Sequence, residues 1–272
     1  MASKIHPSAI VAKEARIASG VEIGPYCLIG PNVTIGSGTR LLGHVVVDGH
    51  TQIGENCSIF YGACLGAAPQ DKKYKGEVSY LTIGSDNIIR EYVTINVGAS
   101  SGCKTIIGNK NFLMASSHIG HDCVIGNEVV LVNGGGLGGH VVVEDQVVIG
   151  GHTGIHQFCR VGKLAMIGGL SKVVVDVPPF SMCDGNPAVV KGINAVGLKR
   201  AGLSSSQAMK IKKAIKILFM SGMALTHALE QLSLEVEMDA QIKALMEFTK
   251  KSKRGVARQS SSKSEPEIDN VV

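Results

Sequence analysis

Five of the nine histidines of this 272-residue chain lie within one short stretch, and one of them precedes an acidic residue. The five are His118, His121, His140, His152 and His156, and the acidic residue is Asp122. Imidazole titrates near neutrality and can accept a proton from a hydroxyl group, and a carboxylate beside it can orient the ring. The stretch is therefore suited to general-base chemistry.

A six-residue repeat positions these residues. Steps of six from Ile5 to Val173 meet Ile, Leu or Val everywhere except at positions 71, 77 and 101. A second column, two residues earlier, holds small or β-branched residues, so both columns share the inner face of a short strand. Gly often follows the aliphatic position, where a sharp corner is least strained without a Cβ. The repeat predicts a hexapeptide parallel β-helix in which each coil has three sides, one hexapeptide to a side.

The five histidines fall outside both inward columns, so we expect them on the outer surface of this prism. Their positions modulo 18 predict that they share one side and corner, and that Asp122 and His140, separated by one full coil, stack directly. A metal site is the alternative, since imidazole is also a common zinc ligand. No two of the five are separated by one or two whole coils, as ligands on stacked coils would be, so we expect no metal and no cofactor.

The missed positions keep the repeat in phase on either side, which predicts loops protruding near 67–80 and 98–104. We expect the β-helix over 1–185, its coils ending near Pro178 and Pro179. Apolar residues at helical spacing then follow a Ser204–Ser206 cap cluster, and two more amphipathic stretches around 225–232 and 242–248 complete a small α-helical domain over 186–251. Ser-rich residues 252–272 read as a disordered tail.

Composition narrows the class of protein further. No run of 18 apolar residues exists, so we expect no membrane span, and no secretory signal is evident. Four of the seven cysteines, Cys27, Cys57, Cys123 and Cys159, occupy the small inward column, which predicts packed, reduced thiols. Residues 186–272 carry a net charge of +6, from 14 Lys and Arg against 8 Asp and Glu, whereas 1–185 carry −1. This excess of basic residues suits binding of phosphate groups or of an acidic partner. The alternative interpretation is that the basic residues form a solvated helix face. No nucleic-acid partner is expected.

Several motifs together resemble the UDP-N-acetylglucosamine acyltransferases of lipid A synthesis. They are the segments 118–123, 138–140, 155–159 and 197–200, with the loop 70–74 and the Asp-Val-Pro-Pro run at 176–179, and the similarity extends over about residues 3–256. The resemblance implies a left-handed coil and a homotrimer with active sites between subunits. It implies transfer of an (R)-3-hydroxyacyl group from acyl carrier protein to the 3-hydroxyl of UDP-N-acetylglucosamine.

The same resemblance implies a role for each matching residue. His121 would be the general base, Asp122 its orienting partner, and the Gly139 N–H a donor to the oxyanion. Substrate would be positioned by Gln70, Asp71 and Lys73 in the loop, by His118 and His140 at the acyl and sugar sites, by His156 and Gln157 near the nucleotide, and by Asn194 and Arg200 at the diphosphate. Gly169 matches the position that limits acyl length, where Gly leaves room for a long chain.

Two departures from the family pattern are Val196, where a carboxylate is common, and Ala201, where a second Arg is common. Other activities remain open: a related UDP-glucosamine N-acyltransferase, or a non-catalytic β-helical scaffold. The N-acyltransferase is disfavoured because the repeat starts at Ile5, without room for an extra N-terminal domain. We expect a soluble intracellular protein, cytoplasmic in a bacterium, or mitochondrial in a plant homologue whose targeting peptide lies outside this sequence.

Overall fold

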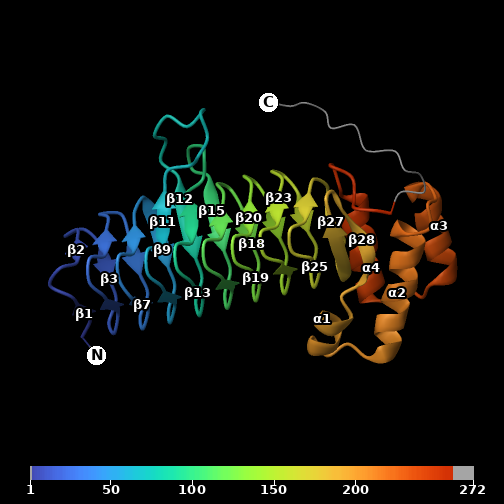
Figure 1. The fold of residues 1–272 in the computed structure, drawn as a ribbon, viewed down its shortest axis with the longest axis horizontal. Coiled ribbons are helices and arrows are strands. Elements are labelled where there is room, and N and C mark those ends of the chain that lie inside the picture. Colours follow the sequence, from blue (N-terminus) through green and yellow to red (C-terminus); the bar gives the residue numbers. More distant parts are fainter. Residues whose placement is uncertain (1, 260–272) are drawn as a thin grey trace.

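Short parallel strands stack in three sheets along the computed structural model, which describes residues 2–259, and helices cover one end of the stack (Figure 1). The first sheet contains β1 (Lys4–Ile5), β4 (Glu22–Ile23), β7 (Arg40–Leu41), β10 (Ser58–Ile59), β13 (Ile88–Ile89), β16 (Phe112–Leu113), β19 (Val130–Leu131), β22 (Val148–Ile149), β25 (Met166–Ile167), β27 (Ser181–Gly185) and β28 (Ala188–Ile193). The second contains β2 (Ile10–Val11), β5 (Leu28–Ile29), β8 (Val46–Val47), β11 (Cys64–Ala67), β14 (Thr94–Asn96), β17 (His118–Ile119), β20 (Gly136–Leu137), β23 (Gly154–Ile155) and β26 (Lys172–Val173). The third contains β3 (Arg16–Ile17), β6 (Thr34–Ile35), β9 (His50–Ile53), β12 (Tyr80–Ile83), β15 (Lys104–Ile107), β18 (Val124–Ile125), β21 (Val142–Val143) and β24 (Arg160–Val161).

The inward columns form the core, as the repeat predicts. In the central coils the aliphatic residues are buried, for example Ile59, Ile119 and Val161. The coils form a left-handed β-helix. Cys27, Cys57, Cys123 and Cys159 are buried free thiols. Burial raises the pKa of Cys123 to about 12 and that of Cys159 to about 11, so both stay protonated packing residues.

Two insertions lengthen the coils without disturbing their register. Val46 pairs with Cys64 at the interval of an unextended coil, but Cys64 pairs with Thr94, and Thr94 with His118, over longer intervals. The extra chain lies between β11 and β12, in the loop that projects in Figure 1, and between β14 and β15. Both loops leave where the chain passes from the second sheet to the third, which we call the second–third corner.

The C-terminal boundaries differ from those predicted. The coils do not end at Pro178 and Pro179, because these prolines lie in the connection before β27, which still pairs with β25. The predicted boundary at 185/186 falls inside the antiparallel β27–β28 hairpin, and the first helix begins at Ala195.

Up to residue 259, the helices that follow are α1 (Ala195–Arg200), α2 (Ser205–Phe219), α3 (Leu225–Glu235) and α4 (Ala240–Lys250). Ser204 and Gln207 form a capping box at the start of α2, and the apolar residues predicted from Ile211 to Phe219 are buried. Within residues 2–259 no helix has the length and apolar character needed to cross a bilayer.

The predicted disordered tail is wrong for its first residues. Val256 and Ala257 are buried, and a bridge joins Val256 to Asp176, with the Ala257 N–H donating to the Asp176 carbonyl. Hydrogen bonds from Arg254 to the Val174 carbonyl and from the Gln259 N–H to the Phe219 carbonyl also hold this segment against the end of the coils and α2. Residues 260–272 lie outside the described structure.

Candidate active site

A groove of about 450 Å³ follows the second–third corner across several coils. It contains six of the residues predicted for the site: Gln70, His118, His121, Gly139, His156 and Gln157. Its remaining lining is Asn96, Gly120, Gly136, Leu137, Gly138 and Ile155. Four glycines in this lining keep the floor of the groove free of side chains.

His121 and Asp122 form the most clearly defined pair in the groove. Their Nδ1 and Oδ2 atoms are 2.7 Å apart, and the side chains are 14% and 9% exposed. The same carboxylate oxygen accepts a 3.0 Å hydrogen bond from the Ala99 N–H in the second inserted loop, and the Asp122 N–H donates to Thr105 Oγ1. Because the carboxylate accepts from Nδ1, the unprotonated Nε2 of a neutral His121 is available to a substrate.

Gly139, on the next coil, lies directly against His121. A Cβ at Gly139 would stand 2.5 Å from both Nε2 and Cε1 of the imidazole, far inside van der Waals contact. Only glycine therefore lets the backbone approach the ring at this distance.

His140 completes the cluster on the exposed side. Its ring meets that of His121 edge to face, with centroids 5.1 Å apart, and stacks on Phe158 at 4.5 Å. Its Nε2 lies 3.7 Å from Asp122 Oδ2, so the predicted stacking of Asp122 and His140 is confirmed. The potential ligand atoms of His121, Asp122 and His140 lie within 4.8 Å of one another, so the corner brings together two histidines from neighbouring coils.

His118 lies on β17, three residues before His121, and is half-buried. Its Nδ1 is 2.7 Å from Thr94 Oγ1. Burial, and then the charge of His121, hold the pKa of His118 below its usual value, which favours a neutral ring.

The prediction that all five histidines share one corner is wrong for His152. It precedes β23, where the chain passes from the first sheet to the second, and packs against Gly134. A whole strand of the second sheet separates that corner from the groove, and the modulo-18 positions do not show this separation.

Seven of the predicted site residues do not line the groove of their own chain. Two of these, Asp122 and His140, contact His121 at its edge, and the other five lie further away. In the first loop, Asp71 Oδ1 accepts from the Lys73 N–H. Gly169 lies at the first–second corner beside Gly151. Asn194 is buried and caps α1, its Oδ1 accepting from Gly197 and its Nδ2 donating to the Leu164 carbonyl. Arg200 is the exposed last residue of α1.

Three polar residues that the sequence did not single out support the groove: Thr94, Asn96 and Thr105. Asn96 Nδ2 donates to the Ala68 carbonyl at 3.0 Å and so fixes the root of the first loop. The sequence did contain a signal for these residues. If each skipped repeat position is counted as one inserted hexapeptide, Thr94 and Asn96 fall on the coil that precedes the histidines.

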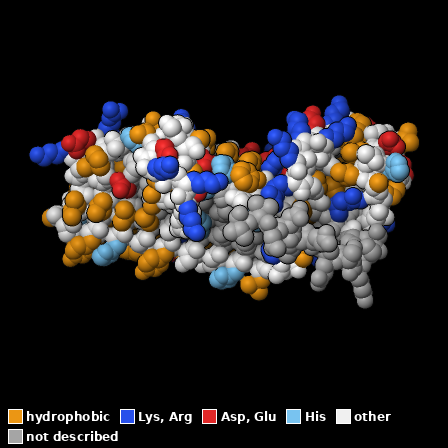
Figure 2. All heavy atoms as spheres, turned by 90° about the horizontal axis from the view of Figure 1, so that it is seen from above, with side chains coloured by type: hydrophobic (Ala, Val, Ile, Leu, Met, Phe, Trp, Pro, Cys, Tyr) orange, Lys and Arg blue, Asp and Glu red, His pale blue; other side chains and the backbone are white. Residues whose placement is uncertain are grey.

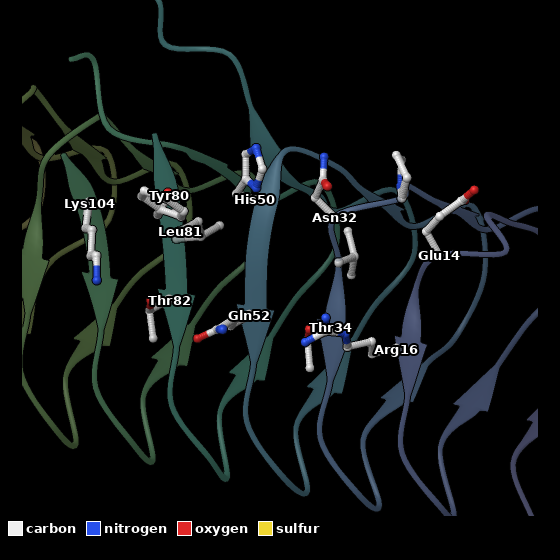
Figure 3. A pocket seen from close by; sticks show the side chains of 12 residues that line it. Glu14, Arg16, Asn32, Thr34, His50, Gln52, Tyr80, Leu81, Thr82 and Lys104 are labelled. Carbon is white, nitrogen blue, oxygen red and sulfur yellow. The ribbon is translucent and has the colours of Figure 1, made fainter. Parts of the chain in front are cut away.

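A second hollow, about 420 Å³, lies over the third sheet nearer the N-terminus and is lined by polar residues that include Arg16, His50 and Lys104 (Figure 3). None of the predicted site residues lines it.

The comparisons with known proteins point to one family. A family model described as "Udp N-acetylglucosamine O-acyltransferase; Domain 2" matches residues 176–257, and a bacterial transferase hexapeptide model matches 2–37. An acyl-[acyl-carrier-protein]–UDP-N-acetylglucosamine O-acyltransferase of Thermodesulfovibrio yellowstonii is 49% identical, over 94% of this chain and 100% of the relative. The crystal structure of UDP-N-acetylglucosamine O-acyltransferase from Moraxella catarrhalis matches with 42% identity and a TM-score of 0.88, over 93% and 99% of the two chains. That of the Arabidopsis UDP-N-acetylglucosamine acyltransferase matches with 35% identity and a TM-score of 0.82, over 93% and 100%.

Proposed function

The chain belongs to the family of acyl-[acyl-carrier-protein]–UDP-N-acetylglucosamine O-acyltransferases, and from this premise we propose how its groove performs acyl transfer. The reaction moves an (R)-3-hydroxyacyl group from acyl carrier protein to the 3-hydroxyl of UDP-N-acetylglucosamine, in the first step of lipid A biosynthesis. The observation that supports the mechanism best is the hydrogen-bonded His121–Asp122 pair beside Gly139.

His121 is the general base in this proposal. Nδ1 donates to Asp122, so Nε2 takes the proton of the sugar hydroxyl as its oxygen attacks the thioester carbonyl. Asp122 keeps the ring in this tautomer and stabilises the imidazolium that forms. The proton then passes to the departing thiolate of the carrier.

Gly139 supplies the electrophilic assistance. Its backbone N–H donates to the oxyanion that develops on the thioester carbonyl, and its missing side chain keeps that donor close to Nε2 of His121. Donor and base on neighbouring coils can thus act on one tetrahedral centre.

The residues outside the groove act, in this proposal, on a neighbouring copy of the chain in a homotrimer. Asp71, Lys73, Asn194 and Arg200 match family positions that contact substrate, yet none lines its own groove. Mixing inactive His121→Ala chains with inactive Lys73→Ala chains should restore part of the activity if the sites form between subunits. Mixtures that stay inactive after subunit exchange would refute shared sites.

An acidic carrier protein suits the basic helical part. In Figure 2 several Lys and Arg side chains gather on the half of the molecule that carries these helices. Lys210 and Lys213 are paired with Glu237 and Glu235, but within the described residues Lys212 and Lys216 form no ion pair. Salt should therefore raise KM for acyl carrier protein more than for the nucleotide sugar.

Thin-layer assay of UDP-N-acetylglucosamine with hydroxyacyl carrier proteins of several lengths tests the function. Wild type should form product, most rapidly with a long chain if Gly169 leaves the room proposed for it. His121→Ala should lose activity while remaining folded, and His152→Ala, at the other corner, is the matched control. No acylation, or acylation only of an amino-sugar acceptor, would overturn the assignment.

A further inference from the structure

Thr94 is the residue whose placement the proposed mechanism does not use. It is the register partner of His118 on the preceding coil, although the second loop separates the two further in sequence than an ordinary coil would. Directly opposed residues on neighbouring strands place their side chains in contact. The distance of 2.7 Å between Thr94 Oγ1 and His118 Nδ1 is that of a short, well-formed hydrogen bond.

In the part of the chain that the structure describes, the hydrogen bond to the His118 ring comes from this side. Its partner on the following coil is Gly136, which has no side chain, and a Cβ built there would meet nothing within 4 Å. Within residues 2–259, Thr94 is the side chain that hydrogen-bonds to His118. The open space above the ring belongs to the groove, since both His118 and Gly136 line it.

A neutral imidazole without this bond would have two freedoms. The ring could rotate by 180° about its last torsion, which exchanges Nδ1 with a carbon, and its single proton could lie on either nitrogen. Engaging Nδ1 removes the first freedom and leaves Nε2 as the polar atom free for a ligand in the groove. Because a hydroxyl can donate or accept, either tautomer keeps the bond.

We propose that Thr94 is a positioning residue for acyl transfer: its hydroxyl fixes the orientation of the His118 ring, so that Nε2 of His118, rather than a ring carbon, meets the bound substrate. The inference rests on the proposed function, because it assigns the second histidine of that same groove its orienting partner. Thr94 itself touches His118 rather than substrate.

Kinetics of four variants test this. Thr94→Val keeps the shape of the side chain and removes the hydroxyl, and should lower kcat/KM for UDP-N-acetylglucosamine about five- to tenfold, the worth of one neutral hydrogen bond. Thr94→Ser restores the hydroxyl and should stay within about twofold of wild type. Adding Thr94→Val to His118→Ala should cost nothing further, because Thr94 would act only through His118.

Thr153→Val is the matched control. Thr153 is a buried, inward-facing threonine just before β23 of the same sheet. Its Oγ1 donates to the Gly168 carbonyl, and it does not line the groove. Its replacement should lower Tm without changing kcat/KM. Full activity of Thr94→Val, an equal loss in the His118→Ala background, or failure of Thr94→Ser to rescue would each overturn the proposal.

A measurement that does not depend on catalysis tests the role of Thr94 independently of the proposed function. In spectra of 15N-histidine-labelled protein, the His118 signals are assigned by their disappearance in His118→Ala. The Nδ1 shift of His118 should change in Thr94→Val, because Nδ1 loses its hydrogen bond, and should return toward the wild-type value in Thr94→Ser. Unchanged nitrogen shifts would refute the role of Thr94. Absence of acyl transfer by wild type would instead refute the function and leave this measurement standing.

Discussion

The contact between Gly139 and His121 makes one substitution especially informative. Gly139→Ala adds a single methyl group and leaves the backbone N–H in place. The methyl would stand 2.5 Å from Nε2 and Cε1 of His121, whereas ordinary contact begins at 3.4 Å, so the ring must retreat by about 0.9 Å.

That movement should affect catalysis far more than binding. His121 is held by a 2.7 Å bond to Asp122, which a shift of this size would stretch or break. A displacement of about 1 Å at a reacting group costs on the order of 10²-fold in rate. We therefore expect kcat of Gly139→Ala to fall about 10²-fold, with KM for UDP-N-acetylglucosamine changed much less.

Gly154→Ala is the control, because a Cβ there meets nothing within 4 Å and Gly154 lies on the following coil of the same sheet, outside the groove lining. It should retain wild-type turnover. A Gly139→Ala enzyme within about threefold of wild type would refute the proposed arrangement of base and oxyanion donor. An equal loss in Gly154→Ala would show that any added methyl disturbs the stack.

Four further outcomes are expected. Asp122→Asn should lower kcat by about 10²- to 10⁴-fold in steady-state assays, since an amide cannot stabilise the imidazolium and can hold the wrong tautomer; near-normal turnover would contradict this. The pKa of His118 is lower in the folded protein than its ordinary 6.5, so the unfolded state binds more protons and stability falls as pH drops below about 6.5; in thermal melts His118→Gln should flatten that slope. Dialysis against a chelator should leave acyl transfer unchanged, and lost activity restored by zinc would show that the groove needs a metal. Arg160→Met should destabilise the fold by about 2–4 kcal/mol in denaturant titrations, because Arg160 stacks 4.0 Å from the Phe248 ring centroid and faces the buried Asp176; an unchanged midpoint would show that neither contact matters.

The coil architecture followed from the sequence because its cause is strictly periodic. An aliphatic residue at every sixth position can be buried in only one way over so many repeats, and the groove then followed from residues that share a corner. The prediction was wrong for His152 because positions modulo 18 give only the distance along the coil and do not show where its corners lie. A strand of the second sheet separates the corner of His152 from that of His121.

The features that could not be predicted from the sequence depend on tertiary contacts rather than on the six-residue repeat. Thr94 is more than one ordinary coil away from its partner His118 in sequence, at an interval set by the length of an inserted loop. Helix α1 has six residues, fewer than two turns, and one of them, Leu198, is buried, so no helical periodicity could mark it. Val256 and Ala257 stand among polar residues, and their burial is decided by the open coil end that they meet.

The stacked coils also determine which disturbances can reach the groove. Each coil is held by its two neighbours, but the first coil has only one, and Ile5 and Ile10 there are 45% and 69% exposed, against 0% for Ile119 beside the histidines. Five strands of the second sheet precede β17, so fraying from that end must open several coils before it reaches His121. At the other end the helices and the segment around Val256 close the stack. The corner that carries the groove is thus insulated from local melting at the exposed end of the stack, and the early coils can lose stability without opening it.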